Sequence, residues 1–142
     1  MKASLFILAV LSSLLAHVSS QGITIAYPPA GANIYKGTQV SVQVIKNAHI
    51  MASTEIGLAI GIHSCENGQC PPAESNLGTV LYAGPFLPSV HEGHGQEYEN
   101  ISVTIPSYVP DGHSVLNVVR FFLIGAGPSA TIGSATVHIN VV

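Results

Sequence analysis

The sequence predicts an all-β protein, a single immunoglobulin- or fibronectin-like β-sandwich of about seven strands between Gln21 and Val142. Three observations support this prediction. Apolar and polar residues alternate with a period of two in several segments, which is typical of strands with one face in a core. Glycines and prolines, 14 and 9 in number, separate these segments. No segment of useful length shows the 3.6-residue period of an amphipathic helix.

Four strands are predicted in the first part of the chain, each bounded by residues that favour turns. Ile23–Tyr27 ends at two prolines, and Gln39–Val44 alternates polar residues with valine. Ile56–Ile62 alternates large residues with very small ones and leads into a cysteine-containing loop. Thr79–Tyr82 is short and ends before a Gly-Pro pair.

Three further strands are predicted towards the C-terminus. Asn100–Ile105 alternates up to a proline, and Thr136–Val141 alternates at the end of the chain. Val115–Ile124 is the longest apolar run, so we expect a central strand that is buried on much of both faces. The inward-facing residues of the alternating strands form the predicted core: Val40, Val42, Val44, Ile101, Val103, Ile105, Val137 and Ile139.

Residues 1–20 are predicted to be a secretory signal peptide. Lys2 gives a basic start, Leu5–Leu15 is apolar except for two serines, and small residues precede Gln21; this is the three-part pattern of an exported chain. The apolar run is short for a membrane span, so we favour export over a membrane anchor or a buried N-terminal helix. We therefore expect a secreted, extracellular protein whose β-sandwich domain covers residues 21–142.

The composition excludes nucleic acid as a partner. Only 8% of the residues are charged, and four Lys and Arg residues stand against seven Asp and Glu. Nucleic-acid binding needs clustered cations that release counterions. The high apolar content, 47%, combined with low charge also argues against a disordered chain.

Two cysteines, Cys65 and Cys70, are predicted to form a local disulfide, because a closely spaced pair in an exported chain is usually bridged. Asn67 and Gly68 lie between them and tolerate positive φ, which suits a tight turn. Closing so short a loop stabilises the folded state by about 2 kcal/mol, so the bridge fixes a loop and does not hold the fold together. Two thiols do not complete a zinc site by themselves.

The most polar segment, His91–Glu99, offers a candidate metal site. Two histidines, His91 and His94, and three glutamates are ligand types that suit zinc, copper or nickel. Its glycines disfavour a helix that would place the ligands on one face, so we interpret it as a solvated loop without a metal. The predicted mature N-terminus, Gln21, is not the histidine that a polysaccharide-cleaving copper oxidase requires.

The sequence contains no recognisable catalytic set. Glycoside hydrolysis needs two carboxylates at a fixed separation, whereas Asp111 lies in a turn and Glu92, Glu97 and Glu99 share one loop. No Gly-x-Ser-x-Gly elbow occurs, and bridged cysteines leave no thiolate nucleophile. We therefore expect a non-catalytic protein without a cofactor.

Asn100 begins the one N-glycosylation sequon, Asn100-Ile101-Ser102. Ile101 is predicted to face the core, so Asn100 faces solvent on the alternating strand. Because the chain is expected to be exported, we predict that this asparagine carries a glycan.

Gly57, Ala59 and Gly61 give one predicted strand a nearly flat face. Such a face allows another backbone or a flat ligand to approach closely. The alternative, which we favour, is that a large side chain such as Phe121 or Phe122 covers it, because dense packing is the commoner reason for small residues.

Binding residues are expected on loops, since a rigid sandwich commonly presents them there. With little charge on the chain, association should depend on shape and apolar contact and only modestly on salt. Three segments are candidates, namely the Cys65–Cys70 loop with Glu66, Asn67 and Gly68, the Ser89–Glu99 loop with His91 and His94, and the Gly125–Pro128 turn with Gly125, Gly127 and Pro128.

Three strand-and-turn strings resemble the fungal necrosis-inducing secreted effector family: Leu77–Pro85, Asn100–Pro106 and Phe121–Pro128. Their order and spacing, and the small cysteine loop before the first string, are also similar, so the resemblance spans most of the mature chain. It implies a secreted virulence protein that binds plant immune receptor-associated kinases and suppresses pattern-triggered immunity. It implies no catalytic residues.

The segment Ile23–Val44, with its Pro-Pro-Ala-Gly string and Gly37-Thr38, also resembles the sandwich domain of fungal cell-wall glucan-assembly proteins. This resemblance covers a smaller part of the chain. It implies an alternative function in binding cell-wall polysaccharide or in wall assembly. Sugar binding would call for an aromatic platform, and the chain has five tyrosines, four phenylalanines and no tryptophan.

Overall fold

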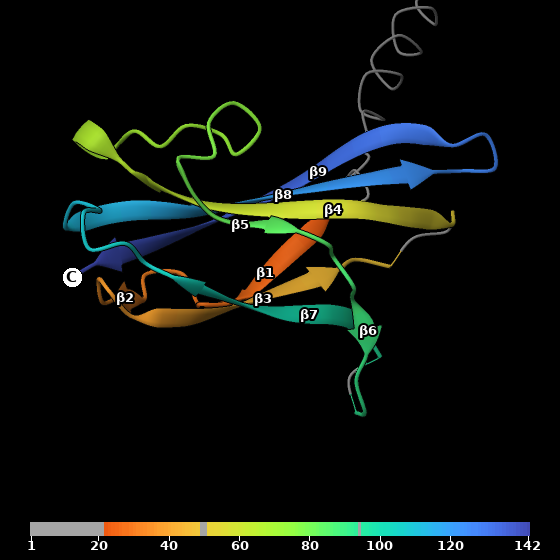
Figure 1. Ribbon diagram of the computed structural model, residues 1–142, viewed down its shortest axis with the longest axis horizontal. Helices are drawn as coiled ribbons and strands as arrows, with labels where there is room; N and C mark the ends of the chain where they lie inside the picture. Colours follow the sequence, from red (N-terminus) through yellow and green to blue (C-terminus); the bar gives the residue numbers. More distant parts are fainter. Residues whose placement is uncertain (1–21, 49–50, 94) are drawn as a thin grey trace, which may run out of the picture.

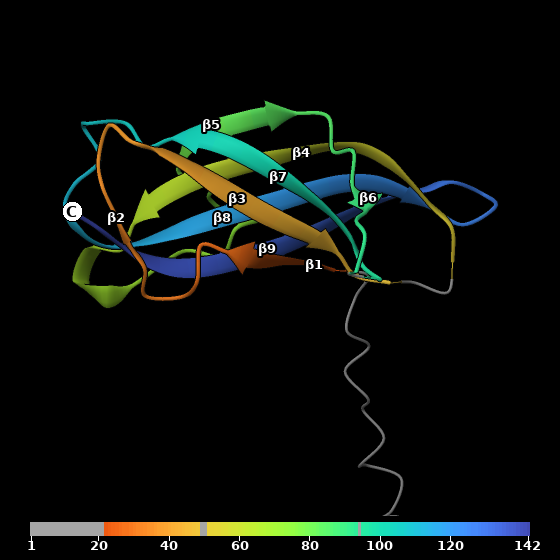
Figure 2. The same ribbon diagram turned by 90° about the horizontal axis from the view of Figure 1, so that it is seen from below.

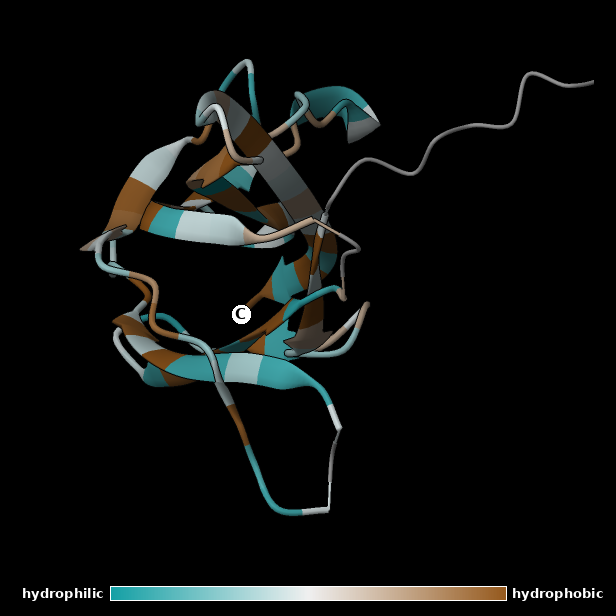
Figure 3. Ribbon diagram, turned by 90° about the vertical axis from the view of Figure 1, so that its right-hand side faces the viewer, coloured by the Kyte–Doolittle hydropathy of each residue, from teal (hydrophilic) through white to brown (hydrophobic). Residues whose placement is uncertain are grey.

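A computed structural model describes residues 22–48, 51–93 and 95–142. The predicted signal peptide lies outside the described residues. Within them, nine β-strands form two sheets that pack face to face (Figure 1), so the predicted β-sandwich is confirmed. Figure 2 shows the four-stranded sheet lying across the five-stranded one, and Figure 3 shows the two sheets as separate layers. The described residues contain no helical segment with the length and hydropathy of a membrane span.

The four-stranded sheet is antiparallel, and its strands have the order β1-β3-β7-β6. Valines at alternate positions of β3 and apolar residues at alternate positions of β7 point inward, and polar residues between them face solvent. The strands are β1 (Ile23–Tyr27), β3 (Gln39–Lys46), β7 (Glu97–Thr104) and β6 (Ser89–Val90).

The five-stranded sheet has the order β2-β9-β8-β4-β5, in which β2 pairs with β9 in parallel and the other pairs are antiparallel. Placing β1, β3 and β7 in one sheet and β4, β8 and β9 in the other is the strand division of an immunoglobulin-like fold. The strands are β2 (Asn33–Ile34), β9 (Ser129–Val141), β8 (Gly112–Ile124), β4 (Ser53–Ser64) and β5 (Thr79–Gly84).

All seven predicted strands are present, and the predicted core is confirmed because its eight members are all buried. Strand β8 lies between β9 and β4 and is buried continuously over residues 114–120, as expected of a central strand. The two strands that were not predicted, β2 and β6, have two residues each. A period of two cannot be recognised over two residues.

The segment of residues 71–78, between the cysteine loop and β5, covers part of the outer face of the five-stranded sheet. Leu77 lies on Gly61, where an added Cβ would come within 2.2 Å of the Leu77 carbonyl oxygen. The expectation that a large side chain covers the small residues is therefore correct at Gly61, where the covering residue is Leu77 instead of Phe121 or Phe122. Phe121 lies beside Gly57 on the neighbouring strand, and Phe122 is buried.

The predicted disulfide joins Cys65 to Cys70, and both cysteines are consumed by it. A short 3₁₀ turn, η1 (Glu66–Gly68), forms the loop. Asn67 and Gly68 adopt positive φ angles of 52° and 75°, as their residue types allow. The bridge therefore fixes this turn at the end of β4.

Candidate functional site

Three loops lie at one end of the sandwich, on the right in Figure 1, and we call this the loop end. They are residues 47–52 between β3 and β4 (described at 47–48 and 51–52), residues 85–96 between β5 and β7 (described at 85–93 and 95–96, with β6 among them), and residues 125–128 between β8 and β9. The first and third are joined by the Gly125 N–H, which donates to the Ala52 carbonyl at 3.2 Å. In variable immunoglobulin domains, the loops at one end of the sandwich form the binding surface.

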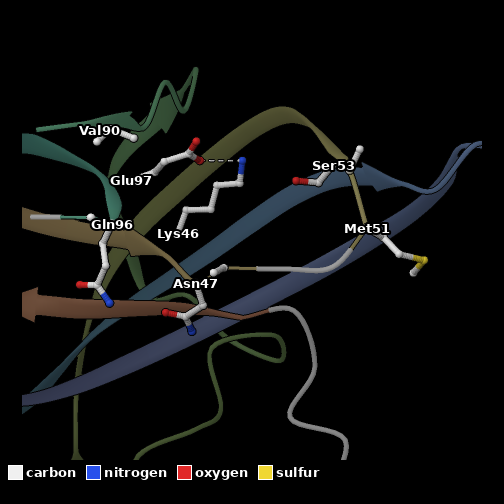
Figure 4. Close-up of a pocket in the computed structure, with 10 residues that line it drawn as sticks. Lys46, Asn47, Met51, Ser53, Val90, Gln96 and Glu97 are labelled. Atoms are coloured by element: carbon white, nitrogen blue, oxygen red, sulfur yellow. Dashed lines mark ion pairs between the residues drawn. The ribbon is translucent and has the colours of Figure 1, made fainter.

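A hollow of about 460 Å³ opens at the loop end, between the first two of these loops (Figure 4). Charged, amide and apolar side chains line this hollow, together with the small residues alanine, serine and glycine. Three large apolar side chains of these loops are mostly exposed, namely Met51 at 52%, Leu87 at 73% and Val90 at 65%. The lining residues are Lys46, Asn47, Ala48, Met51, Ala52, Ser53, Val90, Gly95, Gln96 and Glu97.

Four charged side chains form a network beside this hollow. Lys46 Nζ lies 2.9 Å from a carboxylate oxygen of Glu97, as the dashed line in Figure 4 marks, and 3.6 Å from Glu55. Glu55 also accepts two hydrogen bonds from the guanidinium of Arg120, one of them from Nε at 2.6 Å. Two cations thus face two carboxylates.

Arg120 is the buried member of this network, with 0% of its surface exposed. Its Nη2 also donates to Ser53 Oγ at 3.1 Å, and its guanidinium stacks on the Phe122 ring at 3.8 Å from the ring centre. A buried cation is tolerated only when it is paired and hydrogen-bonded, so these contacts hold β8 against the start of β4 beneath the hollow.

Three of the carboxylates named from the sequence make internal contacts, Asp111 among them through an ion pair of 2.6 Å with Lys36. Glu97 pairs with Lys46, and Glu99 accepts a hydrogen bond from the Leu87 N–H at 2.6 Å, which ties the residue 85–96 loop to β7. Glu92 is exposed. Glu97 and Glu99 therefore hold the neighbouring loop in position through these contacts.

The predicted Ser89–Glu99 loop is shorter in the structure, because β6 takes its first two residues and β7 begins at Glu97. His91 stacks on Tyr98 with ring centres 3.8 Å apart. His94 lies outside the described residues.

The Cys65–Cys70 loop lies at the opposite end, on the left in Figure 1 beside the C-terminus, and we call this the cysteine end. The Cys65 N–H donates to the His113 carbonyl at the start of β8, whereas Gly125 follows the end of β8. A strand of 13 residues spans about 40 Å, so the structure brings two of the three candidate loops together and separates the third. Glu66, Asn67 and Gly68 are exposed there.

Asn100 is exposed in the middle of β7, as predicted. Its side-chain oxygen accepts a hydrogen bond from Gln43 Nε2 on the neighbouring strand at 3.1 Å. The sequon therefore lies on the outer face of the four-stranded sheet, away from the core.

Sequence reasoning missed the network around Arg120. The signal was present, because Arg120 is the one charged residue inside the longest apolar run. A lone cation in a central strand requires a buried anion, but its partner Glu55 lies 65 positions away and could not be identified from spacing.

A protein-family model described as the Nis1 family matches residues 18–140. The match extends from before β1 to the penultimate residue of β9 and so includes both ends of the sandwich. No curated protein matches the chain.

Proposed function

The chain belongs to the Nis1 family, a necrosis-inducing, effector-like family of fungi, and on this basis we propose that it is a secreted, non-catalytic effector. Its proposed action is to bind plant immune receptor-associated kinases and thereby to suppress pattern-triggered immunity. The observation that carries the proposal is the family match over residues 18–140.

The loop end is the proposed kinase-binding surface. Met51, Leu87 and Val90 are large apolar side chains exposed on its loops, and Met51 and Val90 line the hollow. Apolar side chains exposed together are typical of surfaces that bind another protein. The neighbouring charges are paired with one another, so long-range attraction contributes little. Binding should therefore depend weakly on salt.

A binding role without catalysis is supported by the carboxylates. Glu97 and Glu99, the residues that a hydrolase would need, are held by Lys46 and by the Leu87 N–H. Both contacts give these carboxylates a role in holding the loops, which fits a surface that binds a partner.

The proposed export agrees with the disulfide between Cys65 and Cys70, because such bridges persist in oxidising compartments. It also agrees with the exposed sequon at Asn100. The proposed location is thus extracellular, with entry into the host cell as part of the effector role.

The test is expression of the mature chain in plant leaf, with the oxidative burst measured after an immune elicitor and with kinases sought among co-purifying proteins. A reduced burst and a co-purifying kinase are expected. An unchanged burst with no kinase would refute the proposal.

Two substitutions test, in the same assay, whether the loop end is the kinase-binding surface. Val90→Asp places a charge in the apolar part of the loop end and should abolish kinase association. Val80→Asp is the matched control, because Val80 is also an exposed valine but lies on β5, outside the loop end. Equal loss in both variants would argue against the loop end.

The second candidate function, polysaccharide binding, is favoured by two tyrosines at the cysteine end. Tyr35 is 64% and Tyr108 is 73% exposed, and their loops are joined by an ion pair of 2.6 Å between Lys36 and Asp111. Exposed rings can stack on sugars. Retention on β-glucan or chitin that is lost in Tyr108→Ala, without kinase association, would favour this function.

A further inference from the structure

Two histidines lie against the disulfide at the cysteine end. His113 and His138 come from β8 and β9, and their register places them diagonally on one face of the sheet. His113 Nε2 lies 2.9 Å from His138 Nδ1, and Cys70 Sγ lies 3.9 Å from the same Nδ1. Ligand atoms of Cys65, Cys70 and His113 all lie within 4.8 Å of one another.

We propose that reduction of the disulfide turns this cluster into a zinc-binding site with Cys65, Cys70, His113 and His138 as its four ligands. Two thiolates and two imidazoles are a common donor set of structural zinc sites. With bonds of about 2.3 Å to sulfur and about 2.0–2.1 Å to nitrogen, a tetrahedral site separates its ligand atoms by about 3.3–3.8 Å. The separations of 2.9 and 3.9 Å are close to this range.

The strands hold most of the site when the disulfide opens. The Cys65 N–H donates to the His113 carbonyl at 2.9 Å, so Cys65 is attached to β8. His113 and His138 lie on strands that pair over the whole length of β8. The turn of residues 66–70 must adjust, and the His138 ring must move closer to Cys65, because the group of ligand atoms within 4.8 Å of one another holds Cys65, Cys70 and His113. The two sheets keep their places, because the disulfide closes a short loop and does not link them.

The site is also reachable. His113 and His138 are exposed and Cys70 is partly exposed, whereas Cys65 is buried. A metal ion can therefore enter from solvent, and the buried Cys65 would place it against the sheet.

The chemistry balances as a two-electron step. A thiol reductant, such as glutathione or a protein dithiol, gives two electrons and two protons to the S–S bond and is itself oxidised to a disulfide. Two thiols then replace the bridge. Zinc binding releases their two protons, because thiolates are the ligands. The oxidised chain, in which both sulfurs are bonded to each other, lacks this donor set.

The first experiment compares oxidised and reduced forms of the protein secreted by a yeast expression host. Each form is titrated with Co²⁺, and Zn²⁺ is then added as competitor. The reduced form should bind one Co²⁺ with the intense bands of tetrahedral cobalt and thiolate-to-metal charge transfer, and Zn²⁺ should displace it. Native mass spectrometry should show one zinc added and two protons lost. The oxidised form should show neither.

Variants test the histidines. His113→Gln and His138→Gln should each weaken zinc binding by at least about tenfold, since even groups outside the coordination sphere change metal affinity by about 10- to 100-fold. His63→Gln is the control, because His63 contacts the Ser64 carbonyl at 2.8 Å and the Asn76 amide at 3.3 Å instead of the cluster. It should bind zinc as the parent does.

Far-ultraviolet circular dichroism of the reduced protein accompanies each titration. Loss of the β spectrum on reduction would overturn the proposal, because the site requires the folded β8–β9 pair. It would also be overturned by a reduced, folded chain without tetrahedral cobalt bands, or by binding that both histidine variants retain at full strength.

Discussion

Removing the carboxylate of Glu55 is expected to destabilise the protein strongly. Glu55→Gln keeps the size of the side chain but takes away the charge that faces Arg120, which is fully buried. The guanidinium then keeps Ser53 Oγ and the Phe122 ring near it, but it loses the anion that offsets its desolvation.

The magnitude follows from the burial of the pair. Breaking a buried ion pair by removing one partner costs about 3–5 kcal/mol, because the other charge stays uncompensated. A domain of this size has a total stability of about 5–15 kcal/mol. The variant should therefore unfold roughly 10–20 °C below the parent.

Lys46→Met is the matched control within the same network. Lys46 is partly exposed and its partner Glu97 more so, and pairs of this kind contribute at most about 1 kcal/mol. The double variant Glu55→Leu with Arg120→Met should cost less than Glu55→Gln alone, because replacing both charges by apolar groups leaves no buried ion.

The assay is urea denaturation followed by circular dichroism, with the free energy of unfolding obtained by linear extrapolation. If Glu55→Gln lowers this free energy by less than about 1 kcal/mol, water reaches Arg120 and the reasoning from its burial is wrong. The same conclusion would follow if the double variant were as unstable as the sum of its single substitutions.

Three further changes test the outer features of the fold. Gly61→Ala places a Cβ within 2.2 Å of the Leu77 carbonyl oxygen. This substitution should lower the free energy of unfolding by about 1–3 kcal/mol in the same denaturation assay. Gly127→Ala is the control and should leave the free energy of unfolding unchanged, because no atom lies within 4 Å of the added Cβ. Asn100→Gln should lower the mass of the secreted protein by one glycan, which mass spectrometry would detect; an unchanged mass would mean an unoccupied sequon. Replacing Cys65 and Cys70 by serine should cost about 2 kcal/mol, and the parent should gain two hydrogens on reduction, a gain that two freely alkylatable thiols would exclude.

The strands and the core were predictable because each prediction used only local pattern. Val40, Val42 and Val44 alternate with polar residues, and that spacing alone assigns them to one face of a strand. The central position of β8 followed in the same way, since an apolar run without alternation must be covered on both faces.

Features that depend on how strands are brought together were not predictable. His113 and His138 meet because of the register between β8 and β9, and Leu77 rather than an aromatic ring covers Gly61 because the residue 71–78 segment folds back over the sheet. Two thiols alone do not predict a zinc site from the sequence. The tertiary structure supplies two imidazoles from 43 and 68 residues beyond the second cysteine.

The two ends of the sandwich should act independently, because β8 separates them by about 40 Å. Substitutions more than 7–10 Å apart that share no partner usually have additive effects, to within about 0.5 kcal/mol. Val90→Asp should therefore bind zinc in the reduced form like the parent, and His138→Gln should associate with kinase like the parent. A double variant that departs from the sum of the two single variants in either binding free energy would show that β8 couples the ends. Each surface has its own variant and its own measurement. Failure of the effector proposal would therefore not contradict the zinc site, and failure of the zinc site would not contradict the effector proposal.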